Sequence, residues 1–208
     1  MAGRNSYASR SRRPAHDPRL YAVAFGLRTY RHLRETGSTG FHGLSGRPGS
    51  AEWWGGALFI AGVVLSLLAP IAGLLGWVAS PQIGPGQFIL GGAAVLLGIA
   101  ATYAAQTAMG RSWRIGVRSD ERTELVTEGP FALVRNPIFS CMLFTAAALV
   151  VLLPNAVAVA AFACLLLAVE LQVRVVEEPH LLRVHGSKYR SYAGRVGRFV
   201  PGFGLLRG

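Results

Sequence analysis

Long uncharged apolar runs dominate the pattern of hydrophobic and polar positions along this chain. The first two runs cover residues 57–79 and 88–109. Each is long enough for an α-helix to cross the hydrocarbon core of a bilayer, which needs about 20 residues. A third apolar stretch begins at Ile138 and continues almost unbroken to Val169. The pattern therefore predicts an all-α integral membrane protein.

Pro154 and Asn155 interrupt the third stretch. A proline inside a helix removes a backbone hydrogen bond and clashes with the preceding turn, so a single helix is not expected to pass through this pair. We therefore predict a helical hairpin, with one span over residues 138–153 and the next over residues 156–176. Together with the first two runs, this gives about four transmembrane helices.

Basic residues alternate with the predicted spans. The connections 80–87 and 153–155 contain no Lys or Arg. The 21 Lys and Arg residues fall instead in the segments 1–50, 110–137 and 174–208. Because cytoplasmic segments of membrane proteins are enriched in Lys and Arg, this alternation predicts that the N- and C-termini are cytoplasmic.

Composition adds to this interpretation and excludes others. Hydrophobic residues make up 51% of the sequence, charged residues make up 15%, and the net charge is +11. The basic residues flank apolar spans, so we expect them to meet anionic membrane lipids, and we expect no nucleic-acid partner. Cys141 and Cys164 lie inside predicted spans and fit no metal-ligand spacing, so no metal site is expected. Lys188 is the only lysine, which favours a bacterial plasma membrane.

The region 1–50 is predicted to be a basic, partly disordered segment that precedes one membrane domain over residues 51–208. Residues 1–16 are polar and lack periodicity. After Asp17 and Pro18, apolar positions at helical spacing predict an interfacial helix that ends before Gly37. A transit peptide is an alternative interpretation of this arginine-rich stretch.

The last predicted span ends in ionisable residues. Glu170, Arg174 and Glu178 are spaced for i,i+4 pairs, and Glu177 precedes Glu178. Ionisable groups at this depth are costly to bury and are therefore candidates for function. A solvated face held by ordinary ion pairs is the alternative, and it is equally open for Glu170. Two adjacent acids at a membrane surface are suited to hold a cationic small molecule.

Arg135, Asn136 and Pro137 stand directly before the third span. Pro137 fits the first turn of a helix and restricts Asn136 to extended conformations. Free amides at a helix start can donate hydrogen bonds to a carboxylate. The hairpin is predicted to bring this helix start and the acidic helix end to the same membrane face. That combination would suit a zwitterionic ligand with a separate cationic centre.

The arginine-asparagine-proline element, the apolar hairpin and the paired glutamates follow one another along the chain, and this order matches a known family pattern. The stretch LVTEGPFALVRNPIF, followed after the hairpin by VEEPHLLRVHGSKYRSYAGRVGRFVP, resembles the isoprenylcysteine carboxyl methyltransferase and phospholipid methyltransferase family. The resemblance covers residues 110–201. It departs from the family pattern at Asn136, where histidine is usual, at Phe139, where tyrosine is common, and at His185, where phenylalanine is common. Asparagine cannot titrate near pH 7, which argues against an acid or base at position 136.

The resemblance implies an integral-membrane enzyme that uses S-adenosylmethionine to methylate a lipidic or amphipathic acceptor, with a carboxylate favoured as nucleophile. A low-dielectric pocket would favour that reaction, since opposite charges cancel as the bond forms. Arg135 or Arg174 could orient the carboxylate and are the candidate catalytic residues. The residues expected to bind the cofactor are Asn136, Pro137, Phe139, Glu177, Glu178, Tyr189 and Tyr192. Secondary lining is expected from Trp113, Gly129, Pro130 and Phe131.

Two other functions fit parts of the pattern. A membrane reductase would bind a nicotinamide cofactor in a similar C-terminal half, although it would need more spans and a larger polar pocket. A non-enzymatic membrane scaffold would keep the fold without turnover, and the Asn136 departure is compatible with that. Mutation of Glu178 would separate the scaffold from an enzyme.

Overall fold

The computed structural model describes residues 46–109 and 125–206. The regular secondary structure in this part of the chain is helical, apart from one isolated parallel bridge between Val134 and Gly197. The predicted interfacial helix and Trp113 lie outside the described residues. The helical elements are α2 (Ala51–Leu74), α3 (Pro85–Met109), α4 (Pro130–Leu133), α5 (Pro137–Leu152), α6 (Ala156–Leu171), a π-helical segment (Gln172–Glu177) and α7 (Glu178–Ala193).

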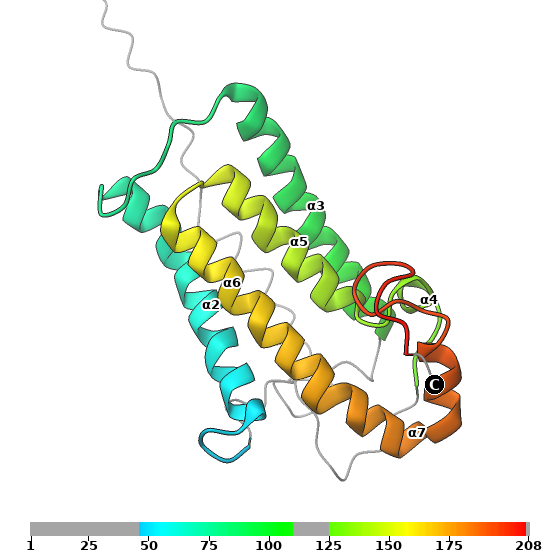
Figure 1. Cartoon of the computed structure of the whole chain (residues 1–208). Coiled ribbons are helices and arrows are strands. Elements are labelled where there is room, and N and C mark those ends of the chain that lie inside the picture. The colour runs from blue at the N-terminus through cyan, green and yellow to red at the C-terminus, as the bar shows by residue number, and fades with distance from the viewer. Residues whose placement is uncertain (1–45, 110–124, 207–208) are drawn as a thin grey trace, which may run out of the picture. The chain divides into compact units, whose positions relative to one another are not determined.

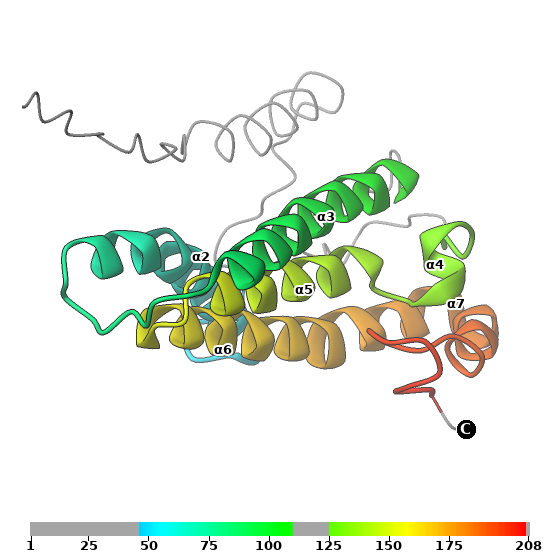
Figure 2. The ribbon, with the colours of Figure 1, turned by 90° about the horizontal axis from the view of Figure 1, so that it is seen from above.

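Helices α5 and α6 form the predicted hairpin at the centre of the helical bundle. Figure 1 shows α6 between α2 and α5, while α3 packs along the other side of α5. The view in Figure 2 shows the same neighbours. Asn155 fixes the hairpin turn, because its side chain accepts a hydrogen bond from Ala158 N at 2.9 Å and donates one to Ala69 O at 3.0 Å. One residue thus caps α6 and ties the turn to α2.

The lengths of these helices support an all-α integral membrane protein. Among the described residues, α2, α3 and the continuous helical run Ala156–Ala193 are long and apolar enough to cross a membrane. Helix α5 is apolar but has only 16 residues, which corresponds to about 24 Å. It therefore falls just short of the usual spanning length. Exposed leucines such as Leu67 and Leu90 give α2 and α3 apolar outer surfaces suited to lipid.

The helix boundaries differ from the prediction at the first span and at the last. Helix α2 begins at Ala51 because Ser50 caps it, accepting a hydrogen bond from Trp53 N at 3.2 Å. It ends at Leu74, shortly before Gly76 adopts a positive φ of 71°. The first span is therefore shifted toward the N-terminus of the predicted range 57–79. For the third span, the observed 137–152 differs from the predicted 138–153 by one residue at each end.

The last helix continues well past the predicted end at residue 176. After the apolar part ends at Leu171, the chain passes through the π-helical segment into α7. Gly186 breaks α7 with φ 52° and ψ −122°, a conformation that side-chain-bearing residues rarely adopt. After α7, the C-terminal segment turns back toward the start of α5 (Figure 1). This return builds the site described next.

Candidate functional site

The C-terminal segment pairs with the residues just before α5. Arg135 N donates a hydrogen bond to Gly197 O at 2.8 Å, and Asn136 N donates one to Arg198 O at 3.1 Å. Gly197 has no room for a side chain, since a Cβ atom there would lie 2.1 Å from Val200 O. The glycine therefore permits a tight turn that places Arg198 next to the start of α5.

The Arg135 side chain is buried and holds several parts of the chain together. Its Nη2 donates to Glu178 Oε1 at 2.6 Å and to Gly204 O at 2.9 Å. Its Nη1 donates to Ala193 O at 2.8 Å and to Val196 O at 2.6 Å. Only 2% of the side chain is exposed, and Nε has no hydrogen-bond partner among the described residues. Arg135 thus joins the start of α5 to both ends of α7 and to the C-terminal segment.

Glu178, the first residue of α7, binds a second arginine. Arg198 Nε donates to Oε1 and Arg198 Nη2 donates to Oε2, both at 2.8 Å. We call these three residues the Arg135–Glu178–Arg198 cluster. Burial alone would raise the pKa of Glu178, but the hydrogen bonds from Arg198 and Arg135 outweigh it and lower the pKa. The Glu178 carboxylate is therefore ionised. A bidentate contact with Arg198 and a single charge-assisted hydrogen bond from Arg135 hold it in place.

Glu177 has a different environment from its neighbour. It is the last residue of the π-helical segment, an element that often marks functional positions. Its carboxylate accepts a long hydrogen bond from Gln172 Nε2 at 3.4 Å and has no cationic partner within 4 Å among the described residues. The pKa of Glu177 is raised to about 7. Burial is the largest cause and raises it, the hydrogen bond from Gln172 lowers it, and the charge of Glu178 raises it. Glu177 is therefore a partly desolvated carboxylate that lacks a counter-charge here.

Tyr189 and Tyr192 belong to the core under the C-terminal segment. Their exposed fractions are 2% and 6%, and their rings meet edge to face with centroids 6.2 Å apart. The Tyr192 hydroxyl donates to Phe131 O at 2.6 Å, and burial raises its pKa to about 12. The two rings pack with Ala193 and with the partly buried residues Leu125, Leu181, Leu182, Val196 and Leu206.

The start of α5 retains donors. Asn136 does not cap the helix with its side chain, and its Nδ2 donates instead to Arg198 O at 3.1 Å. Pro137 has no N–H, and the amides of Ile138 and Phe139 have no hydrogen-bond partner among the described residues. The next residue, Ser140, donates from Oγ to Phe199 O at 2.8 Å. The helix start is thus held by the C-terminal segment while two amides remain available.

The structure brings together much of the predicted site. The predicted proximity of the helix start and the acidic helix end is confirmed by the ion pair between Arg135 and Glu178. Arg174 lies elsewhere: its side chain is 57% exposed and pairs with Glu170 on the helix surface. Arg198 was not among the predicted site residues. The sequence did contain a signal for Arg198, because this residue lies near the basic, proline-ending close of the stretch VEEPHLLRVHGSKYRSYAGRVGRFVP, which carries the family resemblance. Its partner Glu178 could not be inferred from residue spacing.

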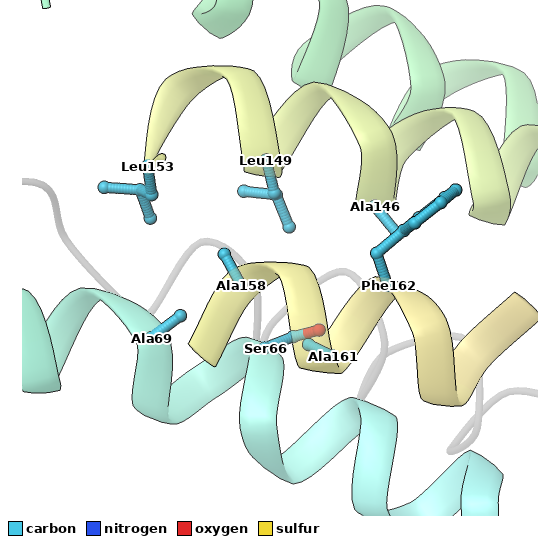
Figure 3. Close-up of a pocket in the computed structure, with 8 residues that line it drawn as sticks. All are labelled: Ser66, Ala69, Ala146, Leu149, Leu153, Ala158, Ala161 and Phe162. Carbon is cyan, nitrogen blue, oxygen red and sulfur yellow. The ribbon is translucent and has the colours of Figure 1, made fainter. Parts of the chain in front are cut away.

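A small apolar pocket lies away from the charged cluster. Figure 3 shows it between α2, the C-terminal half of α5 and the first half of α6, which is the opposite end of the hairpin from Arg135. Its lining is apolar except for Ser66, whose hydroxyl donates to Gly62 O. Within the described ranges, no group of three or more His, Cys, Asp or Glu residues could hold a metal ion.

Comparisons with known proteins agree with the motif. Residues 86–188 match the family "Phospholipid methyltransferase". The chain is 32% identical over 109 residues to protein-S-isoprenylcysteine O-methyltransferase B of Arabidopsis thaliana, covering 51% of this chain and 55% of the relative. It is 28% identical over 115 residues to the nickel-cobalt-cadmium resistance protein NccN of Alcaligenes xylosoxydans xylosoxydans, covering 55% and 54%. The chain thus matches about half the length of these two relatives.

Proposed function

We propose that this chain, whose residues 86–188 belong to the phospholipid methyltransferase family, transfers a methyl group from S-adenosylmethionine to a lipidic or amphipathic acceptor, with a carboxylate favoured. The observation that carries the proposal is the Glu177 carboxylate, which lacks a cationic partner among the described residues and adjoins the Arg135–Glu178–Arg198 cluster. A cationic ligand would supply the missing charge.

The chemistry of the surrounding groups fits this cofactor. Glu177 would pair with one of its positive charges. The amides of Ile138 and Phe139 would donate to its carboxylate, as helix starts commonly do for anions. When bound, the cofactor supplies a methyl group on a positively charged sulfur. Asn136, Pro137, Tyr189 and Tyr192 are the remaining proposed cofactor residues; in this arrangement the two tyrosines support the site from the core.

The cluster gives the site rigidity. Glu178 is held by two arginines, so the first turn of α7 is fixed against the start of α5, and Glu177 is fixed with it. Both Nη atoms of Arg135 are engaged, so we propose that Arg135 acts by holding these segments together. Arg174 is exposed and remains a candidate to orient the acceptor carboxylate. Adjacent lipid and apolar side chains would exclude water from the reacting groups.

We also propose a bacterial plasma membrane as the location, with both termini on the cytoplasmic side. In that orientation the cluster faces the cytoplasm, because Arg135 precedes the start of α5 and Glu178 follows α6, so both lie at the end of the hairpin opposite the turn between these helices. Figure 1 shows this turn and the start of α5 at opposite ends of the hairpin. A water-soluble cofactor would then enter from the cytoplasm, whereas a lipidic acceptor would enter from the bilayer.

The test is calorimetric titration of the detergent-purified protein with S-adenosylhomocysteine. We expect binding that Glu177→Gln weakens by at least about tenfold, equivalent to about 1.4 kcal/mol. Glu170→Gln is the matched control, since Glu170 is an acid of the same helical run whose partner is the exposed Arg174. Absence of binding to a folded sample would refute the methyltransferase. NADPH binding would then point to a reductase, and binding of neither ligand to a scaffold.

A further inference from the structure

Three arginines at this end of the bundle differ in what their side chains have left to bind. Both Nη atoms of Arg135 are occupied, and its side chain is buried. Arg174 is largely exposed and pairs with Glu170. The Arg198 side chain is largely buried, with 14% of it exposed, and its Nε and Nη2 bind Glu178. Its Nη1 donates no hydrogen bond within the described ranges, so this nitrogen is available to a ligand.

The backbone around Arg198 forms a tight loop. Arg198 N donates to Phe203 O at 2.8 Å, and Phe203 N donates to Val200 O at 3.1 Å. Gly202 and Gly204 have φ values of 77° and 71°, which fit the sharp turns. The loop is also held from behind by Ser140 and Asn136, as described above. The Arg198 guanidinium is therefore presented from a fixed backbone.

Exposed apolar side chains stand on the same loop. Phe203 is 73% exposed, Val200 is 54% exposed, and Leu205 is 36% exposed. Large apolar side chains held out by a rigid, hydrogen-bonded loop usually meet a partner. They belong to the same hydrogen-bonded loop as Arg198, so this loop carries both a guanidinium and exposed apolar side chains.

The local charge favours an anion. The Arg135–Glu178–Arg198 cluster contains two guanidinium groups and one carboxylate, so its own charges sum to one positive charge. The neighbouring Glu177 carboxylate is assigned to the cationic cofactor under the proposed function, so it does not offset this charge when the cofactor is bound. Glu170 also acts on Arg198 electrostatically, but its carboxylate pairs with Arg174. A guanidinium that is largely shielded from water binds anionic oxygens more strongly than an exposed one.

We propose that the loop 198–205 is the head-group site for an amphiphile whose anionic head group is a carboxylate. Arg198 Nη1 donates hydrogen bonds to the anionic oxygens, while Phe203 and Val200 contact the adjoining apolar chain. The inference rests on the proposed function, because a carboxylate on an apolar chain is the acceptor class proposed above. It deepens that function by assigning the head group to Arg198 instead of Arg135 or Arg174. A lipid phosphate shares the same chemistry, so the test must separate the two.

The experiment measures binding of a fluorescent long-chain carboxylic acid and its methyl ester to the purified full chain, at a pH where the acid is ionised. We expect the acid to bind at least about tenfold more tightly than the ester, as one charge-assisted hydrogen-bond contact provides. In Arg198→Gln the two probes should bind within about twofold of each other. Arg195→Gln is the matched control: Arg195 is exposed, and its Nε donates to Ser191 O outside the cluster. It should keep the preference.

Two further variants guard against misfolding. Phe203 is largely exposed, so Phe203→Ser should fold normally. It should weaken binding of the long-chain acid while leaving a short-chain acid unaffected. Arg198→Lys keeps the charge beside Glu178 and should retain part of the preference for the acid.

Several results would overturn the inference. These are an acid preference that survives in Arg198→Gln, one that is lost in Arg174→Gln instead, or displacement of the acid by an alkyl phosphate at lower concentration. The last result would assign the site to lipid phosphates. Titration with S-adenosylhomocysteine keeps the two proposals apart. Cofactor binding without an Arg198-dependent preference refutes this inference alone, whereas the reverse pattern refutes the methyltransferase alone.

Discussion

Arg135 and Glu178, 43 residues apart in the chain, form a buried ion pair with 2.6 Å between Nη2 and Oε1. The pair joins the residue before α5 to the first residue of α7. Because Glu178 also binds Arg198, the same carboxylate fixes the C-terminal segment. The two adjacent acids therefore differ in role. Glu178 holds the start of α5 and the C-terminal segment together through its two arginine partners, whereas Glu177 has no counter-charge among the described residues.

Glu178→Ala should destabilise the protein severely. The substitution leaves Arg135, with 2% of its side chain exposed, as an uncompensated buried charge. Losing one partner of a buried pair typically costs about 3–5 kcal/mol. Thermal unfolding in detergent measures the loss. Glu170→Ala, which removes a partly exposed pair, should cost less than about 1 kcal/mol. Equal melting temperatures for the two variants would show that the buried cluster does not stabilise the fold.

Tyr192→Phe should lower the free energy of unfolding by about 1–3 kcal/mol. It removes the hydroxyl that donates a hydrogen bond to the carbonyl oxygen of the buried residue Phe131, and this carbonyl has no other hydrogen-bond donor among the described residues. The control is Tyr189→Phe, since Tyr189 makes no side-chain hydrogen bond within the described ranges. Urea or thermal unfolding compares the two. A larger loss for Tyr189→Phe would contradict the assignment.

Gly197→Ala should free the C-terminal segment. A Cβ atom at this position would lie 2.1 Å from Val200 O and 2.9 Å from Gly202 N, and these backbone atoms cannot move without opening the turn. We expect trypsin to cleave faster at Arg195 and Arg198, and electrophoresis of samples taken during digestion measures the rate. Gly84→Ala is the control, because nothing lies within 4 Å of its added Cβ. Identical digestion of both variants would rule out the tight turn.

The sequence predicted the parts of the structure that depend on local patterning. Uncharged runs predicted the helices, and Pro154 with Asn155 predicted the hairpin turn, where Asn155 caps α6. The hairpin then required the start of α5 and the end of α6 to share a face. That geometric consequence is confirmed by the pair between Arg135 and Glu178.

What the sequence did not reveal depends on contacts between distant segments. The pairing of Val134 with Gly197 is a single bridge with no alternating pattern to signal it. The π-helical segment inserts a wider turn that changes which face Glu177 and Glu178 occupy, and helical i,i+4 spacing cannot anticipate that. The role of Arg198 follows only once both of these features are in place.

Cofactor binding should depend on pH through Glu177. Burial raises the pKa of this carboxyl to about 7 in the folded protein, from an ordinary value of 4.5. The folded state therefore favours the neutral acid, and the destabilisation caused by Glu177 develops as the pH rises from about 4.5 to about 7. A cationic ligand favours the ionised form and should lower this pKa, so its binding releases a proton when the pH is below about 7.

We therefore expect the affinity for S-adenosylmethionine to rise by up to about tenfold per pH unit below pH 7, and to level off above it. Calorimetry in two buffers with different ionisation enthalpies should detect the released proton near pH 6. In Glu177→Gln, binding should be weak and nearly independent of pH, and no Glu177 proton should be released. The same pH profile in wild type and variant would mean that another group titrates, and Glu177 would then lose its proposed role as the partner of the cofactor's positive charge.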